Sequence, residues 1–448
     1  MRYAVTARGG GRPGSGEKAH SRTVWVVTGA AIDGAAAVRA MVRPPTFPDR
    51  EFPVAGGGHD HTGAFREAID ACHAAGGGRV VVPPGEYLTG PIRLRSGVDL
   101  HVSAGATVRF RRDPTAYLPE VPTRWQGVEL MGYSPFVYAY GERDIALTGG
   151  GTLDGRADDA HWWSWKPLEP ADFALLERLA DENVPPARRV FGDGYHLPPS
   201  FVQPYRCENV LISGVTLINS PFWQVHPVLC RNVTVTGVTA RSHGHNNDGC
   251  NPESCDGVVI EDCHFDTGDD CVAIKAGRNA DGRRLAVPCR NIVISDCTFA
   301  DGHGGVTIGS EMSGGVEHVY ASNLRMDSPH LWTCARFKTN SVRGGFIRDV
   351  HVTDVTVGRV RDQVLEIDFA YEEGDAGSFP PGVDGIHLRD WRVASTDAPW
   401  RLAGYPRGPI GTVTLTDVVI DSARSPAVAR DVTDLRLTRV TVNGERLG

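Results

Sequence analysis

The sequence lacks any long apolar run, is poor in cysteine and carries no excess of positive charge. No stretch approaches the roughly 20 apolar residues that a membrane-spanning helix needs. Ten cysteines in 448 residues are too few for a small scaffold held together by disulfides. A net charge of −8 excludes the overall basic field that attracts nucleic acid or anionic membranes. The sequence therefore predicts a globular protein without a nucleic-acid or membrane partner.

The N-terminal region offers only a weak targeting signal. A short apolar stretch, Val24 to Ile32, resembles the core of a signal peptide, but it begins late and runs directly into Asp33. We therefore expect residues 1–45 to be a disordered leader or the result of an early-assigned start, followed by one folded domain over residues 46–448. This interpretation favours a cytoplasmic protein, with secretion as the alternative.

Glycine and proline, in contrast, are plentiful at 53 and 30 residues, which favours short strands joined by turns. A repeat organises these strands: four segments align without gaps, each with alternating apolar residues, a turn and a second short strand. The four are Cys207 to Leu217 (CENVLISGVTL), Cys230 to Ala240 (CRNVTVTGVTA), Cys255 to Phe265 (CDGVVIEDCHF) and Cys289 to Phe299 (CRNIVISDCTF). Weaker copies begin at Glu142, Val316, Ile347, Val383, Ile410 and Val432.

The spacing of the repeat indicates the fold. From Cys207 onward the copies begin 23, 25, 34, 27, 31, 36, 27 and 22 residues apart, as expected for coils with loops of varied length. Propeller blades would need about 40–50 residues per copy, and helical repeats would need helical periodicity. The sequence therefore predicts an all-β protein, a right-handed single-stranded parallel β-helix. In such a solenoid, equivalent positions of consecutive coils lie about 4.8 Å apart.

Two segments depart from the repeat. Residues 62–75 place Ala64, Phe65, Ile69 and Cys72 on one helical face, which predicts an N-terminal helical cap, since solenoid ends need covering. Residues 158–200 contain three tryptophans and a helical stretch near Asp172 to Glu182. They predict a lobe inserted into the β-helix.

Two columns of residues run through the strong copies. One cysteine opens each copy, at Cys207, Cys230, Cys255 and Cys289. One cysteine per coil is not the spacing of a zinc site, so we expect a stack of small inward-facing side chains. The second column consists of Asn209, Asn232 and Asn291, which we expect to satisfy backbone groups at each turn.

Polar, glycine-flanked clusters follow three consecutive strong copies. They contain Asn247 and Asp248 (HGHNNDG), Asp269 and Asp270 (FDTGDDC), and His303 (FADGHGG). Asp269 and His303 both lie 14 residues past the start of their copy, Asp248 lies 18 residues past, and the next coil adds Arg336 and Lys338 (ARFKTN). Because coils stack in register, these side chains are predicted to meet on the outer surface.

Such a group suits the hydrolysis of a glycosidic bond. One carboxylic acid protonates the leaving oxygen, and another carboxylate activates a water molecule. Crowded carboxylates do not all ionise easily, so one of them keeps its proton and serves as the acid. A nearby histidine tunes this balance. Arginine and lysine match a substrate that carries carboxylates, as uronic acids do.

The clusters also resemble a known family. The runs NND (Asn246 to Asp248), GDD (Gly268 to Asp270), GHG (Gly302 to Gly304) and RFK (Arg336 to Lys338) are similar, in the same order, to the motifs NTD, G/QDD, GHG and RIK of glycoside hydrolase family 28, the polygalacturonases. The resemblance extends over roughly residues 50 to 445 and is greatest to bacterial exo-acting members. It implies the pectin-lyase-like β-helix.

The resemblance implies a role for each residue. Asp269 would be the general acid, while Asp248 and Asp270 would hold the attacking water of an inverting reaction. His303 would hydrogen-bond within the carboxylate cluster and help keep the acid protonated.

On the substrate side, Arg336 and Lys338 would bind the sugar carboxylate at the cleavage point, with no metal or cofactor. Asn247 stands where the family has threonine, and we expect it to contact the substrate. Phe337 stands where the family has isoleucine, and we expect it to face the coil interior.

The length of the coil that contains Asp269 bears on the cleavage mode. The loop Ala276 to Arg284 lengthens this coil and supplies Arg278, and Lys275 points near the same face. We expect Lys275 and Arg278 to bind substrate. The loop and the inserted lobe are placed to block one end of the site, and the sequence resembles bacterial exo-acting members here. This resemblance implies release of galacturonate from the ends of polygalacturonate or its oligomers, and we expect the enzyme to be a monomer.

Alternative functions remain. An endo-polygalacturonase, or a rhamnogalacturonan or xylogalacturonan hydrolase, would use the same residues. A pectate lyase would need a Ca²⁺ site and an arginine base instead. A non-catalytic carbohydrate-binding or structural β-helix would need none of these clusters.

Overall fold

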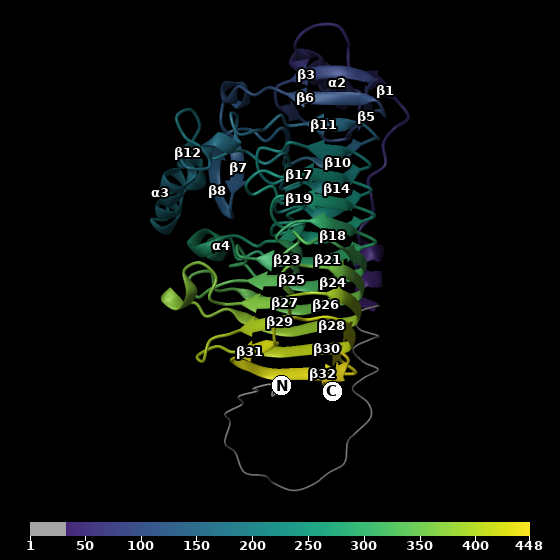
Figure 1. The fold of residues 1–448 in the computed structure, drawn as a ribbon. Coiled ribbons are helices and arrows are strands. Elements are labelled where there is room, and N and C mark those ends of the chain that lie inside the picture. The colour runs from purple at the N-terminus through teal and green to yellow at the C-terminus, as the bar shows by residue number, and fades with distance from the viewer. Residues whose placement is uncertain (1–32) are drawn as a thin grey trace.

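The computed structural model describes residues 33–448, whose main body is a stack of short parallel strands (Figure 1). The coils follow one another from the N-terminal end, at the top of Figure 1, to the C-terminal end at the bottom. The predicted right-handed parallel β-helix is confirmed. No helix among residues 33–448 is long and apolar enough to cross a membrane.

Each complete coil contributes to three ladders of parallel strands. The first ladder contains β1 (Glu51–Pro53), β2 (Gly78–Val82), β5 (Val98–Val102), β10 (Arg143–Thr148), β14 (Glu208–Ser213), β16 (Arg231–Thr236), β18 (Asp256–Glu261) and β21 (Cys289–Ser295). The second contains β3 (Gly85–Thr89), β6 (Ala106–Phe110), β11 (Thr152–Asp154), β15 (Thr216–Ile218), β17 (Thr239–Ser242), β19 (His264–Thr267) and β22 (Thr298–Asp301).

Both ladders continue into longer strands: β24 (Val316–Met326), β26 (Phe346–Arg359), β28 (Gly382–Ser395), β30 (Ile410–Ile420) and β32 (Val432–Thr438), followed by β33 (Thr441–Val442) and β34 (Glu445–Arg446). The third ladder contains β4 (Ile92–Arg93), β9 (Val137–Tyr140), β13 (Val202–Tyr205), β20 (Val272–Ile274), β23 (Gly304–Gly309), β25 (Thr333–Lys338), β27 (Gln363–Asp368), β29 (Ala398–Ala403) and β31 (Val428–Arg430). Single bridges at Val225 and Cys250 connect β13 to β20, so this ladder is continuous past the glycine-flanked polar clusters.

Two positions of the repeat have a left-handed backbone, which explains the bends of each coil. The third position has φ of 55–79° at Asn209, Asn232, Gly257, Asn291, His318 and Asp349. The eighth has φ of 51–75° at Gly214, Gly237, Asp262, Asp296, Asn323 and Asp354. Apart from one histidine, these are the residue types that adopt this conformation at least cost. The repeat therefore encodes its own turns.

This conformation also corrects the expectation for the asparagine column. Asn232 donates to Asn209 Oδ1 at 2.5 Å, and Asn209 donates to Asp144 Oδ1 at 2.7 Å. The amides thus link side chains of successive coils, and the Asn232 side chain also pairs with the backbone N–H and C=O of Arg43, in the segment that follows the first helix. The cysteine column is buried with free thiols, as predicted.

The core fills the inside of the coils. In-register rows such as Val210, Val233, Val258, Ile292 and Val319 are at most 2% exposed. Burial of such a row is favourable by about 25 cal/mol per Å² of apolar surface. Because the inward side chains hold the coils in register, the outward side chains of neighbouring coils are also held next to one another.

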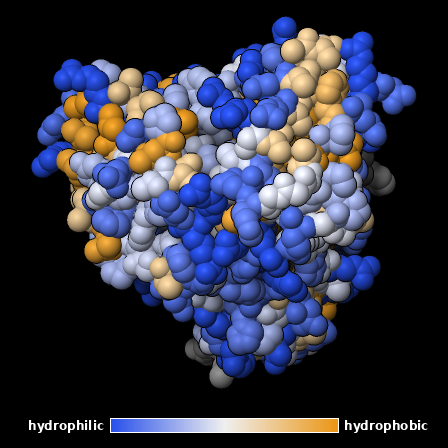
Figure 2. All heavy atoms as spheres, turned by 90° about the horizontal axis from the view of Figure 1, so that it is seen from above, coloured by the Kyte–Doolittle hydropathy of each residue, from blue (hydrophilic) through white to orange (hydrophobic). Residues whose placement is uncertain are grey.

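The predicted N-terminal cap is confirmed as α2 (Thr62–Ala74), which buries Phe65, Ala68, Ile69 and Cys72. Seen from this end, the surface is mainly hydrophilic, with hydrophobic residues in separate groups (Figure 2). Residues 33–41, expected to belong to the leader, instead form a helix that packs Val38 and Val42 against Val259 and Val293. Residues 1–32 of the predicted leader lie outside the described residues.

A lobe stands beside the coils, on the left of Figure 1. It contains the hairpin of β7 (Val121–Trp125) and β8 (Val128–Gly132), together with α3 (Glu169–Asp181) and β12 (Val190–Phe191). Helix α4 (Asn279–Leu285) contacts both α3 and β8. The short helical turns η1 (Pro114–Tyr117), η2 (Trp163–Trp165), η3 (Pro186–Arg188) and η4 (Gly374–Ala376) lie in connecting segments.

Candidate active site

The four motifs meet where the second ladder leads into the third. Asp248 follows β17, Asp269 and Asp270 lie between β19 and β20, and His303 lies between β22 and β23. Backbone bonds stack the turns: Gly249 donates to Asp270 O at 2.9 Å, and His303 donates to Asp269 O at 3.0 Å. The predicted gathering of these residues therefore follows from the register of the coils.

Asp248 is buried, with one carboxylate oxygen held. Its Oδ2 accepts a hydrogen bond from Asn251 Nδ2 at 2.7 Å and lies 3.7 Å from Lys275 Nζ. Burial, with the charge of Asp269 next, raises the pKa of Asp248 well above its usual range, against the opposing effect of Lys275.

Asp269 reaches the surface together with His303; their side chains are 17% and 29% exposed. Its Oδ1 lies 3.0 Å from His303 Nδ1 and accepts a bond from the backbone N–H of Asp270 at 2.9 Å. The imidazole stacks on Trp332, with ring centres 3.6 Å apart. Burial alone would raise the pKa of Asp269, but the His303 hydrogen bond and the Lys338 charge outweigh it and lower that pKa.

Asp270 is held by the predicted cation pair. Lys338 Nζ donates to its Oδ2 at 2.7 Å, and Arg336 Nη1 lies 3.7 Å from its Oδ1, which accepts no hydrogen bond within residues 33–448. Arg336 and Lys338 leave β25 on the same outward side, because Phe337 between them faces the core. Acidic neighbours, Asp270 first, outweigh burial and raise the pKa of both cations.

Three residues predicted to bind substrate are buried instead. Asn247 is 0% exposed; its side-chain oxygen accepts from the Ser242 hydroxyl and the Gly244 N–H, and its side-chain nitrogen donates to the backbone oxygens of Phe222 and His245. Lys275 and Arg278 are 3% and 5% exposed and are paired with glutamates. The structure therefore favours a supporting role for these three side chains, since their polar atoms are already used by the protein.

Arg278 joins three segments beside the carboxylates. Its guanidinium lies 2.7 Å from Glu177 of α3, 3.5 Å from Glu311 and 3.5 Å from Glu372 of the loop after β27. Lys166, from the segment between η2 and α3, donates to Asn246 Oδ1 at 2.5 Å, and the Asn246 amide lies 3.5 Å from Asp269 Oδ2. The lobe thus reaches the first motif itself.

Sequence reasoning missed several of these contributors. Asn251 lies three residues after Asp248 and donates to its carboxylate, but it belongs to none of the four motifs. Tyr371, whose ring centre lies 5.3 Å from Lys338 Nζ, and Lys166 belong to loops without any recognisable motif. Only the fold brings these loops to the site.

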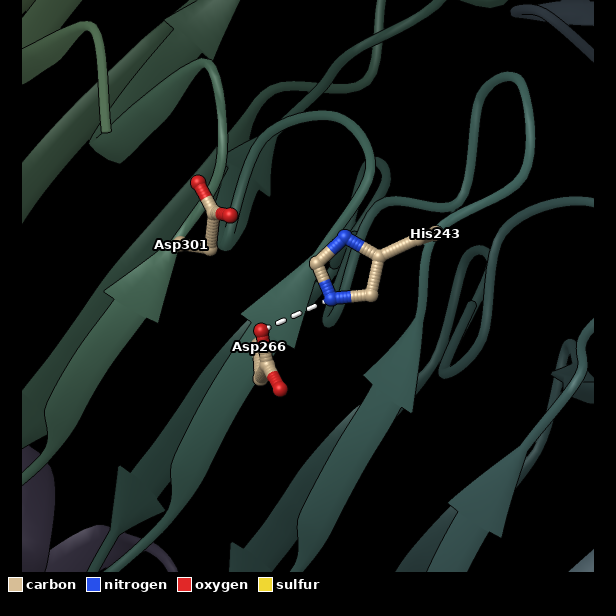
Figure 3. Close-up of side chains that lie close together, drawn as sticks. All are labelled: His243, Asp266 and Asp301. Carbon is tan, nitrogen blue, oxygen red and sulfur yellow. Dashed lines mark hydrogen bonds and ion pairs between the residues drawn. The ribbon is translucent and has the colours of Figure 1, made fainter. Parts of the chain in front are cut away.

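One further group lies on the second ladder near the motifs. His243, Asp266 and Asp301 place possible ligand atoms within 4.8 Å of one another, and His243 Nε2 bonds Asp266 Oδ1 at 2.8 Å (Figure 3). His243 is exposed, and Asp301 Oδ1 accepts the N–H of Gly302 at 2.8 Å. We assign no ion to this group, because its contacts are those of ordinary surface pairs.

A parallel β-helix with carboxylates, an imidazole and paired cations on its outer face defines a glycoside hydrolase that acts on acidic polysaccharide. The family model of glycosyl hydrolases family 28 matches residues 192–435, more than half of the chain. The chain therefore belongs to glycosyl hydrolases family 28.

Relatives agree with this membership. An exopolygalacturonase structure from Thermotoga maritima has a TM-score of 0.90 and 39% sequence identity, and the alignment covers 93% of this chain and 97% of that one. A probable polygalacturonase from Vitis vinifera is 28% identical over 84% of this chain and 74% of its own length. An endo-polygalacturonase from Pectobacterium parmentieri is 28% identical over 66% of this chain and 69% of its own length.

Proposed function

We propose that this enzyme hydrolyses α-1,4-galacturonosidic bonds and releases residues from the chain ends of polygalacturonate or its oligomers. The observation that carries the proposal is the pair Arg336 and Lys338, held against Asp270 within the carboxylate group. A galacturonate carboxylate at the cleavage point would be recognised by these cations. Neutral sugars would offer them no partner.

In the proposed reaction, Asp269 donates a proton to the leaving oxygen, and Asp248 and Asp270 activate the water. This assignment is supported by exposure: Asp269 is the most exposed of the three carboxylates, while side-chain exposure is 3% at Asp248 and 1% at Asp270. The two buried groups each keep one oxygen without a hydrogen bond, suited to a water bound beneath the sugar.

In the free enzyme, the pKa values of the acid and of the base are shifted away from the pattern that this reaction needs. The pKa of Asp248 is raised and that of Asp269 is lowered, the reverse of the expected pattern. A substrate carboxylate at Arg336 and Lys338 would offset the positive charge that now lowers the pKa of Asp269. We propose that substrate binding therefore raises the pKa of Asp269, so that this carboxyl carries the proton that it donates.

The proposed exo mode is supported by the lobe. Lys166 contacts the first motif, and Arg278 ties α3 to the loops that contain Glu311 and Glu372. These contacts form a wall beside the carboxylates, which would stop a long chain from passing through. The Thermotoga maritima relative, named an exopolygalacturonase, also supports this mode. We further propose that the enzyme acts as a monomer and, because pectic polymers lie outside cells, that it is secreted.

A product time course on polygalacturonate and on oligomers of defined length tests the proposal. Galacturonate as the first and main product is expected; a descending series of oligomers would instead mean endo cleavage. A product absorbing at ultraviolet wavelengths would mean a lyase, and turnover only of rhamnose- or xylose-bearing substrates would mean the other family activities. No turnover of any pectic substrate would support a binding role.

A further inference from the structure

Each of the two buried carboxylates has one lysine beside it. Lys338 Nζ donates to Asp270 Oδ2 at 2.7 Å, and Lys275 Nζ lies 3.7 Å from Asp248 Oδ2. Among the described residues, neither Asp248 Oδ1 nor Asp270 Oδ1 accepts a hydrogen bond. Each carboxylate therefore presents one free oxygen, with the other oxygen directed toward a lysine.

Lys275 is fixed from several sides. Its ammonium donates to Glu311 Oε2 at 2.9 Å and to Gly309 O at 3.3 Å, and lies 4.5 Å from the ring centre of Trp223. The side chain is 4% exposed and that of Glu311 is 8% exposed. This buried ammonium donates to Glu311 and Gly309 and has Asp248 3.7 Å away, so its surroundings are occupied by the protein and not by a sugar.

We propose that Lys275 is a positioning residue for Asp248: it holds Oδ2, supplies the compensating positive charge and leaves Oδ1 for the attacking water. This inference rests on the proposed function, in which Asp248 activates that water. Glu311 acts on Asp248 only through Lys275. It fixes the position of the Lys275 ammonium, and its negative charge partly offsets the effect of that ammonium on Asp248. Neither residue touches the substrate.

The charges around this pair set the sign of the effect. Asp269 and Asp270 disfavour ionisation of Asp248, whereas Lys275 and Lys338 favour it. Around Lys275 lie Glu311, Asp248, Asp270 and Lys338. More remotely, Arg278 and Arg343 act on Glu311, and the Lys275 charge acts on His226.

Removing or freeing the ammonium is therefore expected to shift the pH profile in opposite directions. In Lys275→Met the pKa of Asp248 rises further, so the acid limb of kcat/KM moves to higher pH. A charge 3.7 Å away implies a shift between about one and three pH units. In Glu311→Gln the ammonium is freed toward Asp248, the pKa of Asp248 falls, and the limb moves to lower pH.

The experiment measures kcat/KM and kcat against pH on trigalacturonate for the full-length enzyme and its variants. Lys275→Met is expected to lower kcat about 10²-fold with KM changed less than about threefold. Lys275→Arg, which keeps the charge, should retain the wild-type acid limb. Arg189→Met is the matched control. Arg189 and Asp281 form a fully buried ion pair, with 2.8 Å between their charged groups, that includes none of the three site carboxylates. Arg189→Met should lower stability and leave the limb unchanged.

A raised KM with unchanged kcat in Lys275→Met would make Lys275 a substrate-binding residue and overturn the proposal. So would a loss of thermal stability with the wild-type limb retained. If Lys275→Met does not fold, Glu311→Gln decides, and an unshifted limb in that variant overturns the proposal. Failure of the proposed function itself looks different: the wild-type enzyme would then release no galacturonate at any pH.

Discussion

The variant Arg278→Met tests whether the contacts between the lobe and the coils determine the exo mode of cleavage. In the folded enzyme this guanidinium contacts Glu177 at 2.7 Å, Glu311 at 3.5 Å and Glu372 at 3.5 Å, and it lies 4.8 Å from the ring centre of Phe173. Its side chain is only 6% exposed. Methionine keeps much of the volume and removes the charge, so the lobe and the loop after β27 lose their common anchor.

The size of the loss follows from the exposure of the partners. Removing one member of a fully buried ion pair costs about 3–5 kcal/mol, whereas exposed pairs contribute at most about 1 kcal/mol. Glu311 is 8% exposed but keeps Lys275 as a partner, while Glu177 and Glu372 are 27% and 42% exposed. We therefore expect the free energy of unfolding to fall by about 2–3 kcal/mol, with the β-helix intact.

The assay follows the products formed from decagalacturonate. Wild-type enzyme is expected to give galacturonate from the start, whereas Arg278→Met should add internal products and lower the viscosity of polygalacturonate faster per bond cleaved. Arg407→Met is the matched control: Arg407 pairs with Asp375 at the exposed side of the same loop. If Arg278→Met loses the expected stability but still releases only galacturonate, the wall does not set the cleavage mode.

Three further predictions concern the carboxylates and a half-buried histidine. Asp269→Asn should lower kcat about 10⁴-fold, measured as release of reducing ends, without changing the thermal midpoint, measured by calorimetry. Retained turnover would contradict the role of Asp269 as the acid. Burial and the Asp269 charge raise the pKa of Asp248, so kcat/KM should fall as the pH decreases through that raised pKa. If kcat/KM falls only at or below a pH of about 4, the ordinary range of aspartate, Asp248 is not the base. Burial, with the charge of His351 next, lowers the pKa of His387 to about 4. The unfolded chain therefore binds this proton first, and stability should fall between pH of about 6.5 and 4, a slope that His387→Gln should reduce in thermal melts.

The fold was accessible from the sequence because each coil repeats the same local instructions. Gly, Asn or Asp at the eighth position of the copies, as at Gly214 and Asp262, produces the bend, and the alternating apolar residues fill the interior. The coil register then places Asp248, Asp269 and His303 together without any long-range information. The asparagines were expected to bond backbone groups at each turn. This expectation was wrong for Asn209 because asparagine favours both a left-handed turn and a backbone-capping position, and the sequence does not distinguish the two.

The supporting residues were less accessible. Lys275 and Arg278 were recognised as lying near the site, but the burial of Arg278 depends on Glu177 and Glu372, whose positions no local pattern predicts. Lys166 carries no motif at all. A charged residue in a loop has the same appearance in the sequence whether it faces solvent or a partner many residues away.

The sequence by itself therefore determined the β-helix, the family and the residues that gather at the catalytic face, since all three follow from a repeat with a fixed register. Only the tertiary structure decided which charges are buried, in which direction burial and neighbouring charges shift the pKa of each carboxylate, and how the lobe packs against the coils. The physical reason is that these properties depend on desolvation and on contacts between distant loops. Arg278 and Glu177 lie 101 positions apart in the chain and meet only after folding.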